Sequence, residues 1–192
     1  MRDTNWSVRH TRRALTGAPL NTRELTAALT TLFTELVMGA GPPGAGSFVL
    51  NTGDIGLLRS LDTLSAGDAS RSTNGGATIA AHAQHLAFGL SLMNRWAREG
   101  GDPYEDPKWD EAWKTSVVDE AQWNAIRSNL RDHAVRWRET LSLEREVTAS
   151  ELSGMIATIA HVAYHFGAMR QIDKSIRGPT KGTFTQQRRA TA

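Results

Sequence analysis

The sequence predicts an all-α protein, a four-helix bundle with a long connection between the first and second helices. Four segments of about 18 to 27 residues carry helical apolar spacing or helix start and stop residues, and no convincing strand pairs stand beside them. The chain has 192 residues, 40% of them hydrophobic, which suits one domain with a sizeable core. We expect the bundle at residues 21–178, a flexible basic lead at 1–20 and a disordered basic tail at 179–192.

The first helix is predicted from about residue 21 to Met38. It begins at Asn21 and Thr22, which are residue types that cap helices, and its apolar residues recur at spacings of three and four. Two prolines and four glycines in residues 39–46 end it. The connection that follows contains residues 47–51, which are compatible with an extended segment, and residues 55–64, whose leucines predict a short amphipathic helix.

The other three long helices are predicted from their boundaries. The second spans about 77–98, between an Asn-Gly-Gly turn and a Gly-Gly-Asp-Pro stop. The third spans about 119–141 and carries a stripe with Trp123 and Trp137. The fourth spans about 150–176 and begins at a capping box from Thr148 to Glu151. A Trp-rich loop at 103–118 separates the second helix from the third and includes one expected helical turn at 110–114.

Charge and composition exclude several classes of protein. The formal net charge is +2, but residues 1–20 contribute +3 and residues 174–192 contribute +5, so residues 21–173 carry about −6. Such a body is a poor nucleic-acid surface, and we expect no nucleic-acid partner. Two stretches, residues 72–94 and 152–169, are almost free of charge and long enough to consider as membrane spans. Each contains two histidines and several polar residues, so we expect no membrane span. No secretory signal is visible, which makes the cytoplasm the expected location. Without cysteine, any metal must bind His, Asp or Glu.

Two histidines of the fourth helix lie on one face. His161 and His165 are four residues apart, which separates them by only about 40° around a helix. Their neighbours on that face are mostly small or apolar, so both rings should point into the protein. Burying two imidazoles without partners is costly, and a shared cation would compensate both. The alternative is that each ring hydrogen-bonds to a nearby backbone or hydroxyl group.

The second helix carries another uncharged pair, His82 and His85. On ideal geometry His82 lies about 60° from the centre of the apolar stripe and His85 about 120°, so periodicity alone favours His82 as the inward ring. Gly89, Leu92 and Trp96 widen the stripe toward His85, and the preference is weak.

With these motifs, the sequence resembles the DinB-like (YfiT-like) metal-binding four-helix bundles. The resemblance rests on the helix order and on two segments, Thr78–Leu86 with its His-Leu pair and Ile159–Gly167 with its HxxxHxG pattern. It implies a divalent ion, zinc or nickel, held by His85, His161 and His165, with His82 as the alternative ligand. The family pattern often continues with Gln after the Gly, whereas this chain has Ala168, so any role of that Gln is not carried over.

The resemblance also implies a function. A three-histidine site with a vacant position would activate a low-molecular-weight thiol in a transferase or water in a hydrolase, on a small-molecule substrate. It further implies a possible homodimer. The sequence does not choose between the two reactions.

Two other interpretations remain open at this point. The protein could be a non-catalytic ligand-binding or stress-associated bundle whose ion is structural, or all four histidines could be satisfied core residues without an ion. Trp109 and Trp113 in the loop could roof a pocket over the metal, although plain packing of a long loop is the favoured interpretation.

Overall fold

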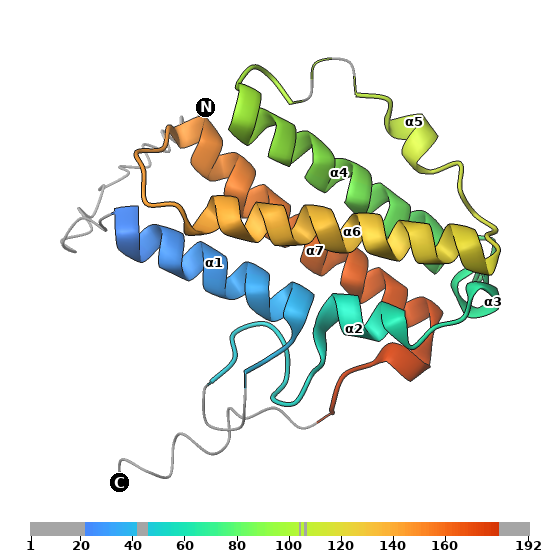
Figure 1. Ribbon diagram of the computed structural model, residues 1–192. Helices are drawn as coiled ribbons and strands as arrows, with labels where there is room; N and C mark the ends of the chain where they lie inside the picture. Colours follow the sequence, from blue (N-terminus) through green and yellow to red (C-terminus); the bar gives the residue numbers. More distant parts are fainter. Residues whose placement is uncertain (1–21, 42–45, 104, 106, 181–192) are drawn as a thin grey trace, which may run out of the picture.

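The computed structural model describes residues 22–41, 46–103, 105 and 107–180, and all regular structure in these ranges is helical (Figure 1). The four long helices are α1 (Thr22–Met38), α4 (Ile79–Glu99), α6 (Glu120–Ser142) and α7 (Ala149–Ile172). The shorter elements are α2 (Gly56–Asp62), α3 (Ala66–Ala69), α5 (Trp109–Ala112) and the 3-10 turn η1 (Lys174–Ile176). The all-α prediction is confirmed. The predicted basic lead and nearly all of the predicted tail lie outside the described residues.

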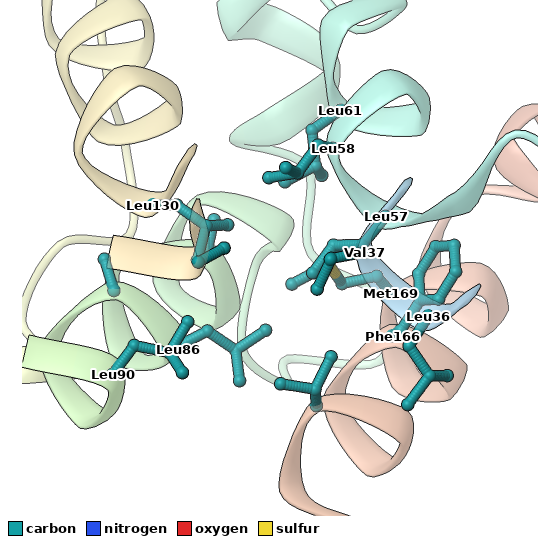
Figure 2. Close-up of a cluster of buried hydrophobic side chains, with 14 of the residues drawn as sticks. Leu36, Val37, Leu57, Leu58, Leu61, Leu86, Leu90, Leu130, Phe166 and Met169 are labelled. Atoms are coloured by element: carbon teal, nitrogen blue, oxygen red, sulfur yellow. The ribbon is translucent and has the colours of Figure 1, made fainter. Parts of the chain in front are cut away.

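The four long helices enclose the core. Both α1 and α4 pack against α6 and α7, so each long helix has two long neighbours (Figure 1). Figure 2 shows apolar side chains from α1, α2, α4, α6 and α7 meeting between them. The largest fully buried side chains include Trp123, Trp137, Phe33 and Phe166. The leucine-rich α2, which lies within the long connection, also packs on α1 and adds its leucines to the core.

Side-chain caps fix where three of these helices begin. The Thr78 hydroxyl accepts the Ala81 N–H at the start of α4. Asp119 with Gln122 forms a capping box at the start of α6, and Thr148 with Glu151 forms one at the start of α7. Two of the capped helices, α4 and α7, carry the histidines. In the described part of the chain, no helix is long and apolar enough to cross a membrane.

The end of the fourth helix differs from the prediction. We expected α7 to continue to about residue 176, but it ends at Ile172. Asp173 adopts an extended backbone, with φ −124° and ψ 116°, and its carboxylate accepts the Ser175 N–H at 2.8 Å. The same carboxylate pairs with Arg71 at 2.7 Å. This side-chain capping competes with a further helical turn, and residues 174–176 form η1 instead.

A buried carboxylate organises the connection after α1. Glu35 is 6% exposed and accepts the backbone N–H groups of Phe48, Val49 and Leu50, the last at 2.6 Å. These residues form bends around the carboxylate and not an extended strand. The sequence also gave no indication of α3, whose four residues begin at a capping box between Ser65 and Asp68.

A buried ion pair ties this connection to the last turns of α7. Asp54 is 2% exposed, and both of its carboxylate oxygens lie 2.8 Å from an Arg170 nitrogen. Asp54 also accepts the Gly56 N–H at 2.9 Å. The Arg170 guanidinium lies 3.8 Å from the centre of the Phe166 ring. Because Phe166 follows His165 directly, this anchor holds the segment of α7 that carries the second histidine.

Candidate metal centre

Four histidines meet between α4 and α7. His82 and His85 project from α4, and His161 and His165 project from α7, which runs in the opposite direction beside it (Figure 1). His82, His85 and His165 are buried, whereas His161 is half-buried. The predicted inward direction of the α7 pair is confirmed for His165 and holds in part for His161. On α4 both rings are buried, so burial does not distinguish His82 from His85.

The Nε2 atoms of three rings converge. His161 Nε2 lies 3.0 Å from His85 Nε2 and 2.8 Å from His165 Nε2. All three residues can offer a ligand nitrogen within 4.8 Å of the others. Within the described ranges, they form the only group of three or more His, Asp or Glu side chains arranged in this way. These are the three residues that the resemblance implies as ligands, whereas the periodicity of the second predicted helix alone favoured His82.

The donor set fits a divalent cation. In its ring plane an imidazole nitrogen holds either one proton or one lone pair, so His161 Nε2 cannot make two well-directed hydrogen bonds to its two neighbours. A cation between the three nitrogens would accept all three lone pairs at once. Imidazole nitrogens are common ligands of zinc and also suit nickel. A three-histidine group here could therefore hold a metal ion.

The environment keeps these imidazoles neutral, which is the form that binds metal. Burial, together with the neighbouring His161 and His82, lowers the pKa of His85 from 6.5 to about 4. Burial and the three other imidazoles lower the pKa of His165 to about 3. Burial also lowers the pKa values of His82 and His161. At neutral pH no proton has to be displaced from these rings before a cation binds.

His82 stands behind the three converging nitrogens. Its Nδ1 lies 2.8 Å from Nδ1 of His165, on the opposite side of the His165 ring from the Nε2 that faces His161. A ligand histidine usually uses its second nitrogen for such a hydrogen bond, which fixes its tautomer and orientation. In contrast, Nδ1 of His85 is buried without a hydrogen-bond partner among the described residues. The geometry therefore places His85, and not His82, in the group of three that could hold an ion.

Two tryptophans of the loop after α4 cover the histidines. The Trp113 ring stacks on His85, with centroids 4.2 Å apart and an interplanar angle of 24°. Trp109 lies 5.2 Å from the His85 centroid and meets Phe88 edge to face at the same distance. The roof was the less favoured of the two interpretations of this loop. Periodicity could not indicate it, because the contact depends on how the loop folds back over α4.

A cavity of about 350 Å³ begins beside His161. It lies one helical turn along α4 and α7 from the converging nitrogens, between Gly89 of α4 and Ala157 of α7. Trp109 forms one wall, and its remaining lining is Leu86, Leu90, Met93, Thr158 and Val162. The centre is therefore next to a space that can admit a small molecule.

Comparison with known proteins adds no relative to this picture: no protein-family model, no curated protein and no solved structure matches the chain.

Proposed function

We propose that this protein is a metal-dependent four-helix bundle of the DinB-like kind, with a divalent zinc or nickel ion on His85, His161 and His165. The observation that carries the proposal is the meeting of three Nε2 atoms from two separate helices, with contacts of 2.8 and 3.0 Å. No cysteine exists in the chain, and no carboxylate belongs to this group among the described residues. Three neutral ligands leave the net charge of such an ion intact.

The proposed chemistry is activation of a nucleophile. An ion on three imidazoles with a further position open lowers the pKa of a thiol or a water that reaches it, which suits an S-transferase or a hydrolase. His82 orients the His165 ring through the contact between their Nδ1 atoms. Trp109 and Trp113 exclude solvent from the histidines, and the cavity beside His161 provides the path for a small molecule.

The remaining elements of the proposal are expectations from the sequence. The protein acts on a small-molecule substrate, with a low-molecular-weight thiol as the nucleophile in the transferase case. It acts in the cytoplasm and forms a homodimer. The negative charge of about −6 on residues 21–173 supports a small-molecule role over binding to nucleic acid.

Metal analysis of protein prepared without a nickel column tests the proposal. We expect one zinc or nickel ion per chain, lost in His85→Ala, His161→Ala and His165→Ala and retained in His133→Ala. His133 is the matched control, since it is a partly buried histidine on α6 outside the cluster. A chain that takes up no ion after incubation with zinc or nickel at neutral pH would overturn the proposal.

The same variants separate a functional ion from a structural one. If the ion serves chemistry, His161→Ala loses metal but keeps its helical circular dichroism and its cooperative unfolding. If the ion is structural, removal of metal unfolds the wild-type protein as well. The size of the core favours the first result, because α1, α4, α6 and α7 bury apolar residues along their whole length, independently of the histidines.

A further inference from the structure

The cavity beside His161 has an almost entirely apolar lining. Leu86, Leu90 and Met93 come from α4, Val162 comes from α7, and the ring of Trp109 closes one side. Among the residues that the structure describes, no charged side chain lines the cavity. Leu86 and Leu90 also belong to the hydrophobic core (Figure 2), so the floor of the cavity is the core itself. A charged or strongly hydrated group would lose its water here without compensation.

The polar side-chain atoms of the lining are few, and two of them are already engaged. The Thr158 hydroxyl donates to the Gly154 carbonyl at 2.8 Å. His161 directs Nε2 at the other two histidines. A ligand rich in hydroxyl or amide groups would therefore find almost no partners along these walls, whereas an alkyl or aryl group needs none.

A glycine keeps the cavity open. Gly89 lies inside α4, where glycine costs about 0.5 to 1 kcal/mol relative to alanine. Its backbone is not in the left-handed region, so its conformation does not require glycine. A Cβ at Gly89 would stand 3.6 Å from His161 Cε1 and 3.8 Å from Trp109 Cη2, which are ordinary contacts. Packing therefore does not require glycine either, and the missing side chain leaves space between the histidine and the tryptophan.

A second cavity of about 460 Å³ lies farther along α7. Asp102, Ser150 and Ser153 line it, and Ala157 lines both cavities. Ser150 is eleven positions before His161, a rise of roughly 16 Å along a helix.

We infer that the cavity between Gly89, Trp109 and Ala157 binds the uncharged alkyl or aryl part of an extended substrate, whose polar reacting group lies at the three histidines. This inference rests on the proposed function, because it assigns the substrate class to that same centre. Gly89 is the specificity-determining position: without a side chain there, the cavity admits a chain that a leucine would exclude.

A series of straight-chain hydroxamic acids tests the inference on the zinc-loaded full-length protein. The hydroxamate group binds zinc in every member, and only the tail changes, from two to eight carbons. Titration calorimetry should show affinity rising roughly fourfold per added methylene, the factor expected for burying one CH₂. An eight-carbon hydroxamate with a carboxylate at the far end should bind at least about tenfold more weakly than the plain analogue, because the lining offers no cation.

Filling the cavity should remove the dependence on chain length. We expect Gly89→Leu to gain nothing from longer tails, so that its affinities for the eight-carbon and the two-carbon hydroxamates become about equal. Ala157→Leu narrows the same cavity from the other helix and replaces the first variant if that one does not fold. Gly167→Leu is the matched control, since it is a helical glycine of α7 whose Cβ would meet nothing within 4 Å. The control should retain the full chain-length series.

The outcomes separate this inference from the proposed function. Zinc binding with hydroxamate affinity that does not change with tail length would overturn the inference and leave the metal centre intact. Equal chain-length dependence in the wild type, Gly89→Leu and Ala157→Leu would also overturn it. If the protein binds no zinc, the test is the binding of 1-octanol to the metal-free protein. That binding is followed by the shift of the Gly89 amide resonance and by the change in tryptophan emission. Binding that Ala157→Leu abolishes supports the apolar specificity, and no binding overturns it.

Discussion

The ion pair between Asp54 and Arg170 is predicted to be one of the most sensitive points of the fold. Asp54→Ala removes a 2%-exposed carboxylate and leaves the Arg170 guanidinium, whose side chain is 17% exposed, without its counter-ion. The variant also leaves the Gly56 N–H without its acceptor. Removing one partner of a buried ion pair typically costs about 3 to 5 kcal/mol, because the remaining charge stays buried. For a chain of this size, that corresponds to a fall in Tm of about 6 to 20 °C.

An exposed ion pair of the same protein provides the control. Asp62 pairs with Arg131 at 2.6 Å and more distantly with Arg127 at 3.5 Å, and the side chains of Asp62 and Arg131 are 43% and 41% exposed. Asp62→Ala should therefore cost no more than about 1 kcal/mol. In the double variant Asp54→Ala/Arg170→Met, no charge is left unpaired, and part of the lost stability should return.

Chemical denaturation of the four proteins, followed by circular dichroism, gives the free energies of unfolding. We expect Asp54→Ala to be the least stable and the double variant to lie between it and the wild type. Equal losses for Asp54→Ala and Asp62→Ala would refute the argument that burial of the charge, and not the salt bridge itself, sets the cost.

Three further predictions concern the centre and its supports. Metal-free protein should lose stability as the pH falls below 6.5. The pKa values of His85 and His165 are about 4 and about 3 in the fold, so below pH 6.5 the unfolded chain binds more protons than the folded one. Each of these two histidines should lower the free energy of unfolding by up to about 1.4 kcal/mol per pH unit. Thermal melts at pH 7.5 and 5.5 measure this, and an unchanged Tm would contradict it. Gly154→Ala should lower Tm despite the better helix propensity of alanine, since its Cβ would come within 2.8 Å of Trp96, and a higher Tm would count against the packing described. Glu35→Ala should cost about 2 to 4 kcal/mol by leaving three backbone N–H groups without their acceptor, and amide exchange at residues 48–50 should accelerate, whereas unchanged protection would refute that role.

The fold class could be predicted because it depends on local signals. The caps at Thr78, Asp119 and Thr148 and the glycines after α1 and α4 define the long helices within a few residues. The end of α7 could not be predicted, because Asp173 stops the helix partly through Arg71, about a hundred residues earlier in the chain. Similarly, no local pattern pairs Asp54 with Arg170.

The candidate site was predictable to the extent that helix geometry determines it. Spacings of three and four put His161 with His165 and His82 near His85. Which of His82 and His85 joins the α7 pair depends on the rotation of α4 against α7, and the ambiguous stripe of α4 did not encode that rotation. The tryptophan roof and the cavity depend on the separation of helices and on loop contacts, and neither has a periodic signature.

X-ray absorption at the zinc edge of the loaded protein tests the central claim most directly. We predict a first shell with three imidazole nitrogens at about 2.0 to 2.1 Å, reduced to two in each of the variants His85→Ala, His161→Ala and His165→Ala and unchanged in number in His82→Ala. A first shell that keeps all its imidazoles in His85→Ala, or contains none in the wild type, would contradict the convergence of α4 and α7 on one ion.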